Sequence, residues 1–239
     1  MTEIKQLTKL FEQFSYAQSY ATAFTEMLDW MLLPFKMCDT QEEQKQALER
    51  YQGHPKTGLL VKLLTEIGDL SEGYRDPLGE LYMQLISQGR MGQYFTPEPI
   101  CDMIAAMQVG DNSQPKQTVL DPACGSGRML LSAAKLNRHM RFYGADLDNT
   151  CCKMALLNML LNSLTGEIAC MDSLSNEFHV GYKLHTTLVD GYHTPYYVEF
   201  TDSELSNICL KALKVEPVFD TAYEPVSIKS GIGIQGSLF

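Results

Sequence analysis

Residues 118–127 read Thr-Val-Leu-Asp-Pro-Ala-Cys-Gly-Ser-Gly, and this stretch decides the fold. Its apolar start, Thr118 to Leu120, predicts a short strand, and the apolar positions of 129–136 recur at helical spacing. A glycine-rich loop between a strand and a helix lets the backbone approach a ligand closely, with the amides of the helix N-terminus directed at it. The stretch therefore predicts a ligand-binding strand–loop–helix unit.

The same unit recurs along the chain. Further strands are predicted at 141–145, 166–171, 183–190 and 196–200, and further helices at 154–160 and from Thr201 onward. Strands that alternate with helices pair in parallel through right-handed crossovers. The predicted fold class is therefore α/β, with a doubly wound, Rossmann-like sheet.

The chain divides into three predicted parts. Residues 1–90 form a helical region, because apolar residues recur at helical spacing in several runs. Residues 91–216 hold the α/β domain. Residues 217–239 are rich in Gly, Ser and Pro, and we expect an irregular tail.

The composition fits a cytoplasmic protein. No run of eighteen apolar residues occurs, and the polar N-terminus has no signal-peptide core, so we expect neither a membrane span nor secretion. The seven cysteines form no CxxC pair, which is typical of reduced thiols, and no His/Cys spacing predicts a metal site.

The net charge of −10 bears on nucleic-acid binding. Binding to a phosphate backbone depends on Lys and Arg, and this chain has 19 of these residues against 29 Asp and Glu. If the protein acts on DNA, we expect a partner subunit to supply most of the contact.

Acidic residues follow the predicted strands, where a parallel sheet forms its ligand crevice. Asp146 follows the second strand and can accept hydrogen bonds from a ribose diol. No phosphate-binding lysine follows the glycine loop, which argues against a P-loop nucleotide site. The pattern favours a nucleoside-containing ligand over a purely structural turn.

Four segments carry a family resemblance. Residues 92–97, Gly-Gln-Tyr-Phe-Thr-Pro before a predicted helix, resemble the element that precedes the cofactor loop in N6-adenine DNA methylases, in particular the modification subunits of type I restriction systems. Residues 121–127 resemble that family's cofactor loop, 144–148 its ribose-binding strand end, and 172–174 its next motif. The likeness covers 90–175 well and the C-terminal third poorly.

This resemblance implies a site for S-adenosylmethionine in a methyltransferase-type domain. It implies that 94–97 and the glycine loop hold the methionine portion, that Asp146 binds the ribose, and that Asp172 accepts from the adenine amine. The full implied set is Tyr94, Phe95, Thr96, Pro97, Asp121, Pro122, Ala123, Cys124, Gly125, Gly127, Asp146, Leu147, Asp172 and Ser173.

Structural alternatives remain open for several of these residues. Thr96 and Pro97 also fit a helix start, with Thr96 as the N-cap and Pro97 at the first helical position. Asp148 is better interpreted as a helix cap than as a ligand, and Asp172 can cap the segment that follows it.

The family's catalytic motif, Asn/Asp-Pro-Pro-aromatic after the fourth strand, has no full counterpart here. In the family, its acidic or amide side chain and a proline-fixed carbonyl accept the hydrogens of the target amine. The nearest match is His193-Thr194-Pro195-Tyr196, and in another register Asp190 supplies the carboxylate. The catalytic candidates are therefore Asp190, His193, Pro195 and Tyr196, although the tyrosines here also fit half-buried strand positions.

The resulting hypothesis is an S-adenosylmethionine-dependent adenine-N6 DNA methyltransferase homologue from a restriction-modification or mobile-element system. The alternative is a catalytically impaired cofactor-binding or regulatory protein of the same descent, and methylation of RNA or protein is a third class. The resemblance also implies a sheet about three strands longer than the residues after Phe200 allow. We therefore expect an oligomer, or a complex with other chains, to cover a sheet edge.

Overall fold

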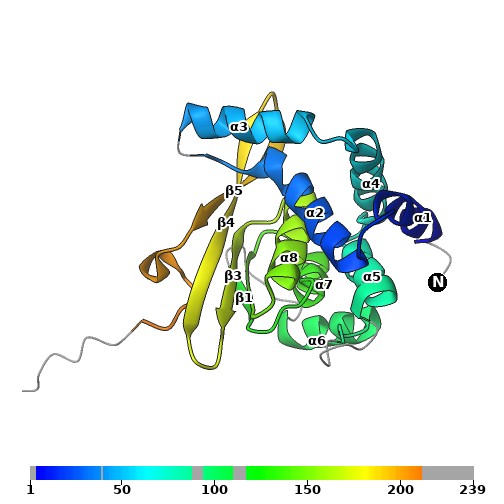
Figure 1. The fold of residues 1–239 in the computed structure, drawn as a ribbon. Helices are drawn as coiled ribbons and strands as arrows, with labels where there is room; N and C mark the ends of the chain where they lie inside the picture. The colour runs from blue at the N-terminus through cyan, green and yellow to red at the C-terminus, as the bar shows by residue number, and fades with distance from the viewer. Residues whose placement is uncertain (1–3, 39, 88–93, 110–116, 212–239) are drawn as a thin grey trace, which may run out of the picture.

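The computed structural model describes residues 4–38, 40–87, 94–109 and 117–211, and it contains one mixed sheet with helices packed mainly on one side (Figure 1). The predicted tail, 217–239, lies outside the described residues. Among those residues, no helix has the length and apolar character to cross a membrane.

The sheet has five strands in the order β1-β2-β3-β4-β5. They are β1 (Thr118–Asp121), β2 (Arg141–Asp146), β3 (Gly166–Asp172), β4 (Glu177–Val189) and β5 (Tyr192–Phe200). The first three pair in parallel, as the sequence predicts, and are joined by α7 (Arg128–Leu136) and α8 (Asn149–Leu161). The strand–loop–helix prediction is confirmed for this half of the sheet.

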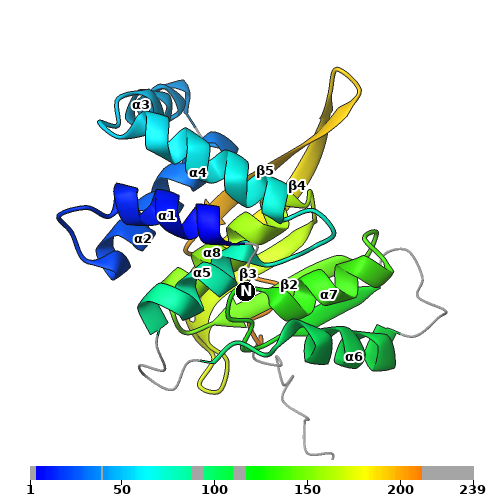
Figure 2. The ribbon, with the colours of Figure 1, turned by 90° about the vertical axis from the view of Figure 1, so that its right-hand side faces the viewer.

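The prediction of continued parallel pairing is wrong after β3. Strand β4 begins at Glu177 rather than at residue 183 and runs antiparallel to β3, and β5 pairs antiparallel with β4. Asp190 and Gly191 connect β4 to β5 with φ values of 50° and 84°. Two consecutive residues with positive φ form the tight turn that the twist of a hairpin favours, and Asp-Gly is a preferred sequence for it. Figure 2 shows the end of this hairpin projecting past the rest of the sheet.

The two faces of the sheet are covered differently. In β3, Ile168 and Cys170 belong to the large core on the helical face, whereas Ala169 and Met171 pack on the other face with Cys209. Both crossover helices lie on the helical face (Figure 1). Within the described residues the sheet is therefore not doubly wound, because a short C-terminal segment rather than a helical layer covers the second face.

That segment contains a single 3-10 turn, η4 (Ser203–Leu205), in place of the predicted helix from Thr201. The buried Glu167 carboxylate accepts hydrogen bonds from the Ser206 hydroxyl at 2.5 Å and from the Asn207 amide and side chain at 2.8–3.1 Å. These contacts hold the backbone in a non-helical path, so the predicted helix is wrong in the part that the structure describes.

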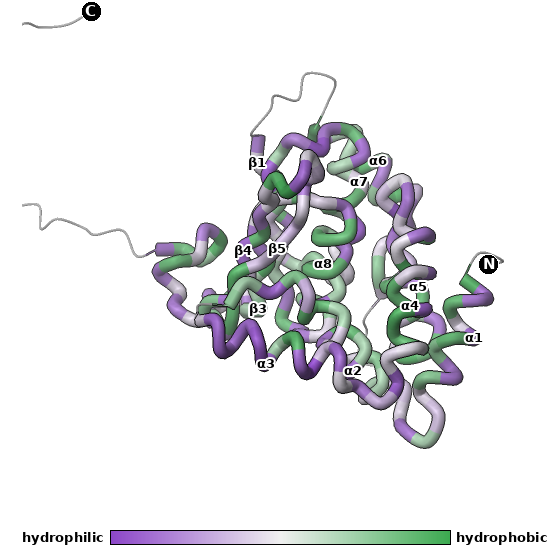
Figure 3. The backbone as a smooth tube through the Cα atoms, turned by 90° about the horizontal axis from the view of Figure 1, so that it is seen from above, coloured by the Kyte–Doolittle hydropathy of each residue, from purple (hydrophilic) through white to green (hydrophobic). Residues whose placement is uncertain are grey.

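The N-terminal region is helical, as predicted. Its elements are α1 (Lys5–Phe14), α2 (Tyr20–Leu32), η1 (Leu33–Phe35), α3 (Gln41–Gln52), α4 (Thr57–Leu70), α5 (Pro77–Tyr82) and the π-helical turn η2 (Met83–Ser87). Helix α6 (Glu98–Val109) belongs to the predicted α/β domain and precedes β1. Ser19 starts α2 by accepting a hydrogen bond from the Thr22 amide at 3.1 Å. Helix α3 is hydrophilic along most of its length, and its residues are largely exposed (Figure 3).

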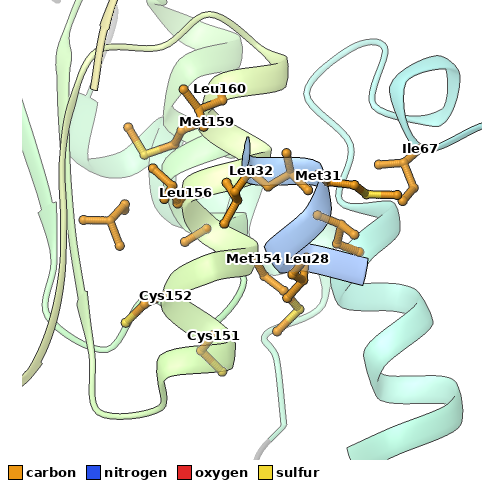
Figure 4. Close-up of a cluster of buried hydrophobic side chains, with 14 of the residues drawn as sticks. Leu28, Met31, Leu32, Ile67, Cys151, Cys152, Met154, Leu156, Met159 and Leu160 are labelled. Carbon is orange, nitrogen blue, oxygen red and sulfur yellow. The ribbon is translucent and has the colours of Figure 1, made fainter. Parts of the chain in front are cut away.

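Helix α8 is buried on nearly all sides because it lies between the sheet and the N-terminal helices. Its residues Met154, Leu156 and Met159 are fully buried, and α2 presents Leu28 and Met31 to the same core (Figure 4). One continuous cluster of buried side chains includes residues from both predicted parts. The helical region and the sheet therefore share a single core.

Candidate functional site

The acidic ends of the parallel strands meet at one edge of the sheet. Asp121 ends β1, Asp146 ends β2 and Asp172 ends β3, and the register pairs Asp121 with Gly144 and Asp146 with Cys170. Because parallel strands end at the same edge, the three predicted carboxylates lie at one edge of the sheet, which is where a parallel sheet forms its ligand crevice.

The glycine loop reaches this crevice in a conformation that other residues rarely adopt. Gly125 has φ 54° and Gly127 has φ 83°. A Cβ atom on Gly125 would lie 2.9 Å from ring atoms of Phe95. The amide of Cys124 donates to the Ala145 carbonyl at 2.8 Å, which joins the loop to β2. Gly127 is the N-cap of α7, so the loop leads directly into the free N-terminal amides of that helix.

Asp146 holds the loop in place. Its Oδ2 accepts from the Gly125 amide at 2.8 Å and its Oδ1 from the Asp148 amide at 2.9 Å. A carboxylate oxygen has two lone pairs, so each oxygen can accept a further hydrogen bond from a ligand hydroxyl. Asp148 in turn accepts from the Thr150 amide at 2.7 Å and caps α8, which agrees with its interpretation as a helix cap.

Asp121 and Asp172 differ in their electrostatic surroundings. Burial raises the pKa of Asp121 above its ordinary value, and the negative charge of Asp146 raises it further. At Asp172 the amides of Leu174 and Ser175, at 2.9 and 3.3 Å, lower the pKa of a half-buried residue's carboxylate. Asp172 thus makes the local contacts expected of a cap, and it lies at the end of β3.

The segment 94–97 lies on the other side of the glycine loop. Phe95 packs on Gly125 and stacks on Tyr82 of α5, with ring centroids 5.8 Å apart. A cavity of about 80 Å³ lies between this segment, the loop and the start of α7. Complete small-molecule pockets are roughly 300–1,000 Å³, so this cavity can take one end of a ligand.

The helix after this segment starts one residue later than predicted. Its first residue is Glu98, and the Pro97 carbonyl accepts from the Cys101 amide at 3.1 Å. Pro97 therefore precedes the helix rather than occupying its first position. Gly92 and Gln93 of the predicted motif lie outside the described residues.

The rim of the crevice is formed by the ends of β2 and β3. The Ser173 hydroxyl donates to the Pro122 carbonyl at 2.7 Å, which joins the end of β3 to the loop. Leu147 exposes 65% of its surface and Leu174 is fully exposed, so an exposed apolar side chain stands near each of Asp146 and Asp172 in sequence. The structure thus brings together the predicted cofactor residues from β1, β2, β3 and the segment 94–97.

The predicted catalytic residues lie elsewhere. Gly166, the first residue of β3, pairs with Leu184, and β4 continues beyond that point to the hairpin turn at Asp190. On β5, Tyr196, Pro195 and His193 pair with positions beyond Leu184 in the same direction. At about 3.3 Å per residue, the thirteen residues of β4 separate the crevice end from the hairpin end by roughly 40 Å. The structure does not bring Asp190, His193, Pro195 and Tyr196 to the crevice.

Sequence analysis missed a group of polar residues beneath the loop. Asp76 is 2% exposed, and its carboxylate accepts hydrogen bonds from Ser126, Arg128 and Asn158. Asp76 precedes Pro77, which is a helix-start signal, and that is the role its sequence context indicates. Its other partners are 50 to 82 residues away in sequence, so no local pattern reveals them.

Comparison with known proteins identifies the family to which this sequence is similar. A family model described as N-6 DNA Methylase matches residues 73–205, more than half of the chain. The methylase subunit of the type I restriction enzyme MpnII from Mycoplasma pneumoniae is 25% identical over 177 residues, which are 64% of this chain and 32% of that protein. The MjaVII methylase subunit from Methanocaldococcus jannaschii is 29% identical over 131 residues, 49% of this chain and 22% of that protein.

A solved structure from Streptococcus thermophilus is also similar. This methyltransferase subunit of a type I restriction-modification system has a TM-score of 0.34 and 16% identity, over 64% of this chain and 39% of that one. The present chain spans about a third or less of the length of the two curated relatives.

Proposed function

The chain belongs to the N-6 DNA methylase family, and on that premise we propose that it provides the cofactor-binding part of an adenine-N6 DNA methyltransferase. S-adenosylmethionine is the cofactor of this family. The observation that carries the proposal is the arrangement of Asp121, the loop 122–127 and Asp146 around one crevice. A purely structural turn accounts for the local contacts of these carboxylates, but it gives no reason for the cavity that Asp121, the segment 94–96 and the loop line together.

The donor set fits this cofactor. S-adenosylmethionine carries positive charge on its sulfonium and ammonium groups, and Asp121, Asp146 and Asp172 provide negative charge at the crevice. The small cavity between Phe95 and Gly125 suits the methionine end, and the oxygens of Asp146 suit the ribose hydroxyls. Leu147 offers an apolar surface for the adenine, with Asp172 as an acceptor for its amine.

The bound cofactor supplies an electrophilic methyl group. The residues of this chain orient it: the loop fixes the amino-acid end, and Asp146 fixes the sugar. The target adenine amine also needs acceptors for its hydrogens. Because Asp190 and His193 lie at the opposite end of the sheet, we propose that the acceptors come from another part of the enzyme.

We further propose that a partner subunit supplies the DNA contact. The net charge of −10 disfavours autonomous binding to a phosphate backbone. A restriction-modification setting and a cytoplasmic location are consistent with the relatives and with the seven free cysteines.

The direct test is calorimetric titration of the protein with S-adenosylmethionine. We expect saturable binding that Asp146→Asn weakens about tenfold or more, because the loop and the sugar lose a charged acceptor. Asp148→Asn is the matched control, since Asp148 caps α8 beside Asp146. Absence of saturable binding by the wild-type protein would overturn the proposal.

A second candidate, a non-catalytic cofactor-binding regulator, is favoured by the position of the hairpin residues. The two candidates differ in turnover. Transfer of radiolabelled methyl groups to DNA, in the presence of the partner subunits, supports the methyltransferase, whereas cofactor binding without transfer supports the regulator. RNA and protein substrates in the same assay test the third class.

A further inference from the structure

The carboxylate of Asp76 connects three parts of the fold. Its Oδ1 accepts from the Gly79 amide and from the Asn158 side chain, both at 2.8 Å. Its Oδ2 accepts from the Ser126 hydroxyl at 2.5 Å and from two guanidinium nitrogens of Arg128 at 3.0 Å. These donors belong to α5, to the start of α7 and to α8, so one side chain joins the helical region to the cofactor loop.

This arrangement exceeds what a helix cap requires. A cap satisfies one or two amides of its own helix, which Asp76 does through Gly79. The other donors come from Ser126, Arg128 and Asn158, in or against the loop. A fully buried charge is tolerated when it is paired and hydrogen-bonded on all sides, and this carboxylate meets that condition.

The guanidinium of Arg128 has a second contact. Its Nη1 donates to the Thr96 carbonyl at 3.1 Å while the other two nitrogens hold Asp76. Thr96 and the loop both line the small cavity. Arg128 therefore connects the segment 94–97 to Asp76, which lies beneath the loop.

Helix α5 packs closely against Asp76 and the loop. A Cβ atom on Gly79 would lie 2.1 Å from Asp76 Oδ2 and 2.7 Å from Ser126 Oγ, so only glycine allows the approach. At the other end of the helix, Tyr82 stacks on Phe95. Helix α5 thus contacts both the loop, at Ser126, and the segment 94–97, at Phe95.

We propose that Asp76 and Arg128 are positioning residues of the cofactor site, which set the separation between the segment 94–97 and the loop 123–127. The proposal rests on the proposed function for its ligand. Neither residue belongs to the predicted cofactor set, and Asp76 is too deeply buried to touch the ligand.

The test compares Arg128→Lys and Asp76→Asn with two controls. Lysine keeps the positive charge but cannot hold Asp76 and Thr96 at once. Asp102→Asn removes a different link between α6 and α7, the contact of Asp102 with Lys135 at 3.0 Å. Ile67→Ala lowers stability from a buried position in α4.

Calorimetric titration with S-adenosylmethionine is carried out well below the melting temperature of each variant. Arg128→Lys and Asp76→Asn should raise Kd roughly tenfold or more. Asp102→Asn and Ile67→Ala should leave Kd unchanged even where they lower Tm. A merely structural role predicts the opposite pattern, in which Kd does not respond once the protein is folded. An unchanged Kd for Arg128→Lys overturns the proposal.

Amide hydrogen exchange gives a readout that needs no ligand. Arg128→Lys should accelerate exchange in 94–97 and 123–127 and leave α4 unchanged. If the wild-type protein fails to bind S-adenosylmethionine but exchange responds in this way, the proposed function fails and the positioning role stands. If exchange in both segments is unaffected, the positioning role is wrong.

Discussion

At the residue scale, we expect the Asp121 carboxylate to strengthen the binding of S-adenosylmethionine and to lower the stability of the ligand-free protein. Burial, with repulsion from Asp146, raises its pKa in the folded protein above the ordinary value of 3.8. The folded state therefore binds a proton more tightly than the unfolded state does. Stability of the ligand-free protein consequently falls as the pH rises through that raised pKa.

Asp121→Asn should therefore raise the melting temperature of the ligand-free protein by about 1–3 °C at pH 7. It should weaken S-adenosylmethionine binding about tenfold, because a cationic ligand loses a negative partner. The wild-type affinity should fall as the pH is lowered through the raised pKa, and the variant should lack this dependence. Thermal denaturation and titration at several pH values check both effects, and a lower melting temperature for the variant contradicts the argument.

Two glycines with positive φ, Gly125 and Gly191, allow the effect of backbone strain to be distinguished from the effect of a side-chain clash. Gly125→Ala and Gly191→Ala both place a side chain at positive φ, and each should cost about 1 kcal/mol of stability. Only the first also drives a methyl group into Phe95, because nothing lies within 4 Å of a Cβ on Gly191. We expect only Gly125→Ala to lose cofactor affinity, by tenfold or more, in titrations of both variants. Equal losses in the two would mean that the Phe95 contact is irrelevant.

The residues that sequence analysis could identify are those with local partners. Asp148 caps the helix that starts beside it, and its neighbours in sequence provide the amides. Asp76 and Arg128 are 52 residues apart, and nothing near either one in the chain indicates the other. Long-range polar pairs of this kind become visible only when the tertiary fold brings them together.

At the scale of elements, the strand–helix alternation from 118 to 172 was predictable because each element carries its own hydrophobic pattern and each strand ends at an acidic residue. The direction of β4 was predicted wrongly as parallel, although Asp190-Gly191 is a hairpin signal. Asp190 was interpreted as part of a catalytic motif, and the preference of Asp-Gly for a hairpin turn was therefore overlooked. The helix expected after Thr201 failed for another reason, since the buried Glu167 competes for the backbone amides.

Helix α8 is the element whose packing matters most for stability. Leu156 is fully buried between the sheet and α2, so Leu156→Ala should cost about 2–5 kcal/mol. Leu136, at the end of α7, is 48% exposed, and Leu136→Ala should cost less than about 1 kcal/mol. Urea denaturation of the two variants measures the difference, and similar losses would contradict the central position of α8.

At the scale of the whole molecule, the predicted border near residue 90 marks a change in the sequence pattern. The residues on its two sides nevertheless share one hydrophobic core. Helix α2 packs on α8, and Lys36, just after η1, pairs with Glu199 of β5 at 2.8 Å. The Met37 amide also donates to the Tyr197 carbonyl. The helical region therefore covers the sheet at both its centre and its edge.

Deletion of residues 1–70 tests this arrangement. The remaining chain keeps α5 and the cofactor loop but exposes the face of α8 that Leu28 and Met31 cover. We expect loss of cooperative unfolding and a strong tendency to aggregate, measured by thermal denaturation and size-exclusion chromatography. Soluble protein with a melting temperature near that of the full chain would show that the sheet can fold independently.

The buried Asp76 link has a thermodynamic consequence for the helices it anchors. Any molecule that immobilises the glycine loop favours the docked position of α5, and a ligand at a hundred times its Kd adds about 2.7 kcal/mol to the folded state. Ligand binding should therefore also stabilise the docked position of α5, which does not contact the ligand. Proteolytic cleavage between α4 and α5 should then slow when the crevice is filled, so digestion of the N-terminal third becomes a gauge of occupancy at the strand ends.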